Sequence, residues 1–205
     1  PPTGRGLLHL PADLACWTSP VRLAADAPIV ANQSPSGVHT IAPYGPRRLL
    51  SARQNGAMIV ERTSRLAAPA EVVWEAVLRA DTFSYVAAPI LRYPPVELAE
   101  LRWAPDLELE GRLLLFGFIP LGTHRIHIES IDEEAWCMQT REGSRTLERW
   151  DHEIYVEPVD DRSCRYRDRL EIEAGTWTPV VGLFARLLFR WRHYRWRRLA
   201  RELAG

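Results

Sequence analysis

From Met58 onward the sequence predicts a definite order of elements: one strand, two short helices, a run of strands joined by short turns, and one long closing helix. The first strand covers 58–66 and the first helix 69–80. Pro69 suits the first helical position, where its missing N–H has no intrahelical partner to lose. Glu71 places negative charge in the first turn, which the helix dipole favours. This order predicts an α+β domain.

Turn signals and residues that alternate between apolar and polar divide the centre of the chain. After a short helix near 81–88, strands are predicted at 97–103, 107–117, 121–131, 135–142, 147–157 and 163–174. The connections are short, so successive strands should pair antiparallel. Thr178 then offers an N-cap and Pro179 a first helical residue for a helix that runs to about Leu203.

Composition excludes several function classes. The 205 residues fit one domain with an extension, and 26 basic residues balance 26 acidic ones, so the chain as a whole is not built for nucleic acid. Every basic residue is arginine, which favours a GC-rich, bacterial genome. No apolar stretch long enough to span a bilayer and no signal peptide is evident, so we expect a cytoplasmic location.

Neither a metal nor another cofactor is expected. Cys16, Cys137 and Cys164 form no C-x-x-C pair, which argues against a zinc site and a disulfide framework. His124 and His127 lie on one predicted strand, where a histidine is more often an ordinary core or surface residue than a ligand.

Residues 1–57 differ from the remainder, because they carry eight prolines and no sustained periodicity. They are either a native arm that packs on the domain or on a neighbouring copy, or a segment upstream of a native start at Met58. We therefore divide the chain into an N-terminal extension, 1–57, and a domain, 58–205.

One hairpin can be registered by charge. Pairing 147–157 with 163–173 so that Glu153 faces Arg167 brings two further pairs of opposite charge together, whereas a slip by two residues creates like-charge contacts. In the preferred register His152 faces Asp168 on the apolar face of the sheet. That pair is either a self-satisfied buried pair, a polar anchor in a ligand cavity, or an acid/base dyad.

The closing helix carries apolar residues along one broad face, and these are predicted to face the core: Val180, Phe184, Leu187, Leu188, Trp191 and Tyr194. Arginines dominate the other side. They form a solvated face or a patch for anionic lipid or an acidic partner. The candidates for peripheral membrane contact are Arg190, Arg195, Arg197 and Arg198.

The residues resemble the SRPBCC superfamily of START and Bet v 1-like proteins, which includes polyketide cyclases, dehydrases and lipid carriers. The resemblance begins with A-A-P-A-E-V-V-W-E-A-V at 67–77. It continues in L-L-L-F-G-F-I-P-L-G at 113–122, R-W-D-H at 149–152 and Y-R-D-R-L-E-I-E-A-G at 166–175, and ends in the closing helix. It implies a helix-grip fold, in which a curved antiparallel sheet of six to seven strands wraps a long C-terminal helix, with two short helices after the first strand.

The resemblance also implies an apolar cavity between the sheet and the closing helix, but no catalytic set is shared across the superfamily. We expect the cavity to hold a small hydrophobic molecule of lipid, polyketide or aromatic class. Its expected lining is Trp136, Met138, Trp150, His152, Tyr166, Asp168, Leu170, Phe184, Leu188 and Trp191. Two alternatives are a cyclase or dehydratase that uses His152 and Asp168, and a membrane or protein-partner module that uses the arginine face. A homodimer is a further expectation.

Overall fold

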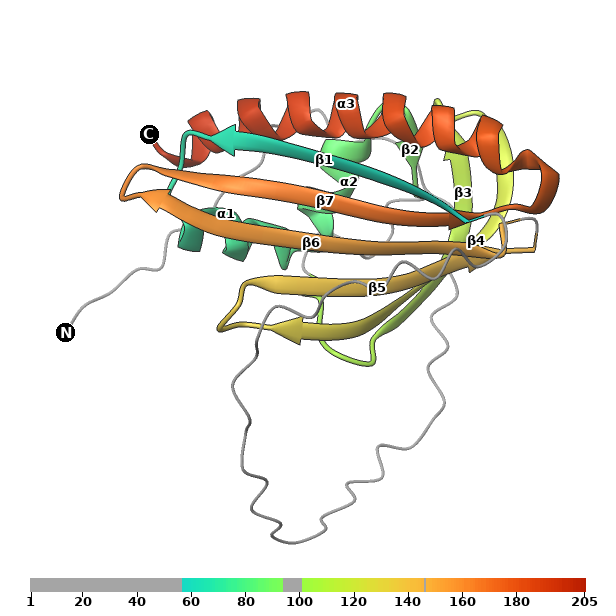
Figure 1. The fold of residues 1–205 in the computed structure, drawn as a ribbon, viewed down its shortest axis with the longest axis horizontal. Helices are drawn as coiled ribbons and strands as arrows, with labels where there is room; N and C mark the ends of the chain where they lie inside the picture. The colour runs from blue at the N-terminus through green and yellow to red at the C-terminus, as the bar shows by residue number, and fades with distance from the viewer. Residues whose placement is uncertain (1–56, 94–100, 146) are drawn as a thin grey trace, which may run out of the picture.

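The computed structural model describes residues 57–93, 101–145 and 147–205. A curled antiparallel sheet of seven strands, in the order β1-β7-β6-β5-β4-β3-β2, lies against one long helix, α3 (Figure 1). The strands are β1 (Met58–Leu66), β2 (Leu91–Arg92), β3 (Glu108–Leu115), β4 (Ile119–Asp132), β5 (Cys137–Ser144), β6 (Arg149–Asp160) and β7 (Ser163–Glu173). The helices are α1 (Ala70–Val77), α2 (Ala80–Ala87), the 3-10 turn η1 (Gly175–Trp177) and α3 (Thr178–Leu203).

This is the helix-grip fold predicted from the sequence. The predicted first strand has the bounds of β1, and the predicted helix at 69–80 ends at Val77, with α2 beginning at Ala80. Of the strand predicted at 97–103, only 101–103 are described, and there Arg102 makes an isolated bridge to Arg79. The extension 1–57 lies outside the described residues except for Ala57, so its role stays a prediction.

The core lies between the concave face of the sheet and the helices. Inward-facing residues alternate along β6 and β7, as expected for strands with one buried face. The larger apolar cluster joins α1, β4–β7 and the C-terminal half of α3, and includes Trp74, Ile128, Val156, Tyr166 and Trp196. A smaller cluster joins β1, β6 and β7 to the N-terminal half of α3, and includes Val60, Trp150, Leu170, Ile172 and Phe189.

The predicted register of the β6–β7 hairpin is wrong by two residues. Glu153 pairs with Arg169 rather than Arg167, and His152 lies opposite Leu170 rather than Asp168. The turn decides the register: Asp160 pairs with Ser163 across a two-residue loop, and a bulge lies just before the turn, between Pro158 and Asp160. The amide of Arg162 donates to Asp160 Oδ1 at 3.0 Å, which fixes that tight turn.

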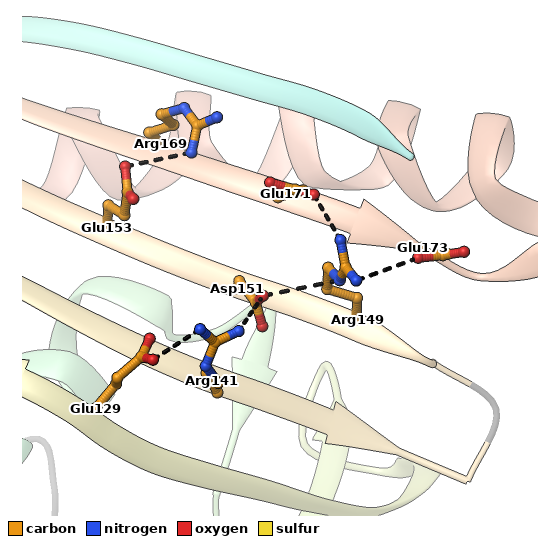
Figure 2. A network of polar contacts seen from close by, with 8 residues as sticks. All are labelled: Glu129, Arg141, Arg149, Asp151, Glu153, Arg169, Glu171 and Glu173. Atoms are coloured by element: carbon orange, nitrogen blue, oxygen red, sulfur yellow. Dashed lines mark hydrogen bonds and ion pairs between the residues drawn. The ribbon is translucent and has the colours of Figure 1, made fainter. Parts of the chain in front are cut away.

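The like-charge contact that argued against this register does form, because Asp151 lies opposite Glu171. Figure 2 shows how it is neutralised: Arg149 Nη1 lies 2.7 Å from Glu171 and its Nε 3.8 Å from Asp151, while Arg141 Nη1 lies 3.2 Å from Asp151. Diagonal arginines therefore compensate for the direct pair. A slip of two residues also leaves every side chain on its predicted face.

The predicted core face of α3 is also wrong. Val180, Leu187 and Tyr194 are more than half exposed, whereas Leu188 is buried and Phe184 and Trp191 are half-buried. The face that meets the sheet consists of Gly182, Ala185, Leu188, Phe189, Arg192, His193, Trp196, Leu199 and Ala200. Gly182 lets β1 approach α3 closely, because a Cβ there would lie 2.1 Å from Met58 Sδ and the Met58 side chain would have to move.

Candidate functional site

Asp168 of β7 is the centre of a buried polar cluster between the sheet and α3. Its carboxylate is completely buried, and Oδ1 lies 2.8 Å from both His152 Nε2 and the Tyr166 hydroxyl. Oδ2 lies 3.3 Å from His193 Nε2 and 3.7 Å from Arg192 Nε, both on α3. One carboxylate thus connects β6, β7 and the closing helix.

The cluster continues to β1. His193 Nδ1 lies 2.8 Å from Ser64 Oγ, and Arg197 Nη2 donates to the same oxygen at 2.9 Å. Ser64 sits opposite Tyr166 in the β1–β7 ladder, so both strands beside α3 present polar groups to the helix at this level. Polar contacts at His193, together with apolar packing, therefore fix the position of α3.

Electrostatics keep the centre of the cluster charged. Burial alone would raise the pKa of Asp168, but the Arg192 guanidinium, His152 and His193 together hold it well below its usual range. Burial opposes the charge on Arg192, yet Asp168 and Tyr166 raise its pKa overall. Burial and the Asp168 charge raise the pKa of Tyr166 well above its ordinary value. Because an ionised carboxylate only accepts, His152 and Tyr166 must donate to Oδ1.

A second buried acid lies on the neighbouring strands. His124 Nε2 lies 3.0 Å from Glu142 Oε2, and Thr140 Oγ1 donates to Oε1 at 2.8 Å. Burial raises the pKa of Glu142, but the bond to His124 and the charges of His124 and His152 outweigh it, so the pKa is lowered overall. His152 is therefore influenced by one carboxylate from β5 and contacts another from β7.

Aromatic rings surround the polar groups. Phe83 of α2 lies 5.7 Å from Tyr93 and 6.0 Å from Trp103 between ring centroids, and the Tyr93 ring lies 6.2 Å from His124. On the α3 side, the ring of Phe189 lies 5.3 Å from that of His152. The interior is thus apolar in its bulk and polar at a few convergent side chains, which is the usual chemistry of a small-molecule site.

The structure brings most of the predicted site residues to this interior. Met138, Trp150, His152, Tyr166, Asp168, Leu170 and Leu188 are buried, and Phe184 packs beside them. Trp136 precedes β5 with a positive φ of 48° and packs against the larger cluster at its edge. Trp191 is half-buried and donates through Nε1 to the carbonyl of Ala88 at 2.7 Å.

Sequence reasoning missed Arg192, His193, Ser64 and Glu142. A signal existed for the two helical residues: Ala185, Phe189, Trp196 and Leu199 recur at helical spacing and share their face. Glu142 has the same parity as Met138 and Thr140, so alternation along the strand placed it inward. The sequence prediction places the arginines of the closing helix in solvent, because the buried partner that compensates Arg192 lies on another element.

One surface depression lies at the β6–β7 turn, away from the Asp168 cluster. It is lined by Arg65, Leu66, Ala67 and residues 160–163. The Arg65 guanidinium is hydrogen-bonded within the depression, where it donates to Ser163 Oγ and to Asp160 Oδ2. Among the described residues, no group of three His, Cys, Asp or Glu side chains could hold a metal ion.

With this geometry in view, the fold defines the class: the chain has the helix-grip fold of START and Bet v 1-like proteins. It resembles a START superfamily protein from Mycobacterium smegmatis with a TM-score of 0.50 and 15% identity, over 69% of this chain and 98% of that chain. It also resembles the Zhui aromatase/cyclase from Streptomyces sp. R1128 with a TM-score of 0.52 and 16% identity, over 71% and 94%. These likenesses concern the fold.

The sequence then gives the family. Residues 64–202 match the family described as Domain of unknown function (DUF8410), and the chain belongs to it. Comparison with curated protein sequences finds no significant match. No helix in the described part of the chain is long and apolar enough to cross a bilayer.

Proposed function

We propose that residues 58–205 form a domain that binds a small hydrophobic ligand in the interior between the sheet and α3, with the Asp168 cluster as its polar anchor. One observation carries the proposal: Asp168 Oδ2, Arg192 Nε and His193 Nε2 are buried without a hydrogen-bond partner among the described residues, and they meet one another only as ion pairs, at 3.7 Å and 3.3 Å. Buried polar atoms are normally paired, so groups that remain available inside an apolar interior favour a guest molecule.

The neighbours in fold support the same class of function. The names of the two structural relatives denote a START protein and an aromatase/cyclase. A carrier and an enzyme would use the same interior here. His152 hydrogen-bonds to the Asp168 carboxylate and acts on the Glu142 carboxylate through its charge, so it is suited to hold a ligand or to move a proton; turnover distinguishes these roles.

Native mass spectrometry of freshly purified protein tests binding directly. We expect a co-purified hydrophobic molecule that is lost on denaturation. A hydrophobic dye should bind with a Kd that rises in the variant Leu188→Asp, which places a charge in the interior, and that is unchanged in the variant Leu183→Asp on the exposed side of the same helix. Failure of every hydrophobic probe to bind the folded protein would overturn the proposal.

The variant His152→Ala separates a carrier from an enzyme. For a carrier, we expect weaker binding of the co-purified molecule and no chemical change in it. For a cyclase or dehydratase that uses His152 and Asp168, the same variant keeps its affinity and loses turnover, as measured by the mass of the bound molecule for loss of water and by its chromatographic retention for ring closure.

A second candidate function is contact with an anionic membrane through the outer face of α3. Large apolar side chains project from this face and are 54–68% exposed: Trp177, Val180, Leu183, Leu187 and Tyr194. Exposed arginines flank them: Arg186, Arg190, Arg197, Arg198 and Arg201. Glu202 is the one acidic residue within α3, so the helix has a strong positive charge in a chain of zero net charge. Such a helix suits an anionic interface.

The hairpin between β3 and β4 carries further exposed apolar side chains: Phe116, Phe118, Ile119 and Leu121. The Phe116 amide donates to the Ile90 carbonyl at 2.8 Å, and Ile90 packs against the cluster that contains Leu188 and Phe189. Ile90 thus links the hairpin to the inner face of α3. Among the four arginines proposed from the sequence, Arg195 differs: it is half-buried, with its guanidinium 3.9 Å from the centre of the Tyr85 ring.

Vesicle flotation tests this second function. We expect binding to vesicles that contain phosphatidylglycerol and little binding to phosphatidylcholine alone, with a loss of binding as salt rises. The double variant Leu183→Glu/Leu187→Glu should not bind, whereas Val159→Glu, at an exposed apolar residue of the β6–β7 hairpin, should bind normally. Equal binding by both variants contradicts the proposal. A dimer in solution that the double variant dissociates assigns the face to a second copy instead.

A further inference from the structure

Arg192 is a buried arginine whose charge is compensated but whose Nε donor has no acceptor. The residue is 5% exposed on the inner face of α3, and its Nε lies 3.7 Å from Asp168 Oδ2. That separation is an ion-pair distance, and Nε makes no hydrogen bond to another described residue, whereas the guanidinium as a whole is also stabilised by Tyr166. The guanidinium carbon, Cζ, lies 5.8 Å from the ring centre of Phe83 and 5.6 Å from that of Phe189.

The Nε donor of Arg192 is therefore buried without an acceptor. A guanidinium presents five N–H donors in a planar fork, and a buried donor without a partner is costly. Asp168 does not satisfy Nε, because its Oδ1 already accepts from His152 and Tyr166 and its Oδ2 is too distant for a good bond. The two phenyl rings restrict the orientation of the fork. An acceptor for Nε must come from outside the described residues.

We propose that Arg192 anchors a hydrophobic ligand that ends in a planar oxygen group, a ketone or a carboxylate, whose oxygen accepts hydrogen bonds from the guanidinium. The inference rests on the ligand-binding function proposed above and adds the chemical class of the ligand. Arginine matches planar oxygen groups in geometry, and bonds to a charged donor are about twice as strong as neutral ones. Phe83 and Phe189 would flank the apolar part that adjoins this group.

The two oxygen groups differ in their response to the surrounding charge. Glu142 acts on Arg192 from β5, and Asp168 lies beside it, so the interior already holds two carboxylates. A ketone brings no further charge to this interior, whereas a carboxylate adds repulsion that the guanidinium must offset. The test therefore includes both groups on chains of the same length.

The probes are lauric acid, a methyl ketone of equal chain length, and laurylamine, which has no acceptor oxygen. Their affinities are measured by displacement of a hydrophobic dye from the full chain. We expect the wild-type protein to bind the better oxygen-bearing probe about tenfold or more tightly than laurylamine. Arg192→Lys keeps the charge and loses the fork, so it should lose most of this preference. Arg125→Lys, at an exposed arginine of β4 on the outer face of the sheet, should keep it.

The outcomes separate this inference from the proposed function. If no probe and no dye binds, the binding function itself fails and the inference fails with it. If all three probes bind equally, or if Arg192→Lys keeps the wild-type ranking, the inference is overturned and the binding function stands. If Arg192→Lys does not fold, the double variant Arg192→Gln/Asp168→Asn removes both charges together. It should bind the dye and show no preference for oxygen, and a retained preference overturns the inference.

Discussion

His152 lies opposite Leu170 in the β6–β7 ladder, yet its Nε2 hydrogen-bonds to Asp168 Oδ1 at 2.8 Å. The bond is diagonal: Asp168 comes two residues before Leu170 in β7 and points to the same face of the sheet. The pair thus forms although the register predicted from the surface charges is wrong. The other carboxylate oxygen, Oδ2, lies near Arg192 and His193 of α3. Asp168 therefore has partners on both β6 and α3.

The variant Asp168→Asn should destabilise the protein by about 3 kcal/mol or more, because it leaves the buried Arg192 charge without its counter-ion. Urea unfolding followed by tryptophan fluorescence measures this. Asp151→Asn is the matched control on the outer face of the sheet, where its ion pairs are partly exposed and the expected cost is below about 1 kcal/mol. Equal losses in the two variants would show that the Asp168 cluster contributes little to stability.

Stability should fall in acid in a way that depends on Asp168. Its pKa in the fold lies well below the ordinary value of 3.8, so below about pH 4 the unfolded chain binds a proton that the native state does not. The free energy of unfolding therefore decreases as pH falls from there toward the native pKa. Glu142, whose pKa is also lowered from 4.5, adds a loss of the same sign.

This loss is measured as the urea midpoint against pH. In Asp168→Asn the curve should be flatter than in the wild type below about pH 4, since one of the two groups no longer titrates. A wild-type curve that rises in acid, or a variant with an unchanged slope, contradicts the assignment of Asp168 as the ionised centre of the cluster.

The variant Arg149→Met tests the compensation seen on the outer face. Without this arginine, Asp151 and Glu171 face each other with less neutralisation, and the expected cost is about 0.5–1 kcal/mol at low salt. Arg149 is 41% exposed, so added salt should reduce the loss. The second change Glu171→Gln in the same chain should recover most of the stability. A loss that is independent of salt would mean that the aliphatic part of Arg149 matters more than its charge.

Thiol reactivity gives a test that does not depend on stability. Burial raises the pKa of Cys164 to about 11 and also raises the pKa of Cys137, so neither thiol ionises appreciably at neutral pH. In a Cys16→Ser background, we expect both thiols to resist a disulfide reagent in the folded protein and to react rapidly in urea. Fast labelling of a thiol in the native state would show that β5 or β7 opens locally.

Secondary structure and side-chain direction were predictable because they depend on local pattern. β1 has its predicted bounds, and β6 and β7 direct the predicted residues inward, since alternation by two residues survives a slip by two. The register depends on a bulge near Pro158 and on the turn held by Asp160, and surface charges alone gave the wrong choice. Arg149 and Arg141 made the rejected register acceptable through contacts with several carboxylates at once.

The polar half of the site could not be found in the same way. Arg192 and His193 look like solvated residues when α3 is considered alone, and only Asp168, on a different element, makes their burial tolerable. The same holds for Glu142, which needs His124 from the neighbouring strand. His152 and Asp168 were found because both lie on one hairpin, where sequence distance and spatial distance agree.

The pairing of β1 has a consequence for how the chain is made. β1 is an edge strand that bonds to β7 and packs on α3 through Met58 and Gly182. During synthesis β1 emerges long before these partners, because β7 and α3 come after β2–β6 in the sequence. Such distant pairing is slow to form. The domain must therefore complete its fold after α3 has left the ribosome, and β1 stays without its partner strand until then.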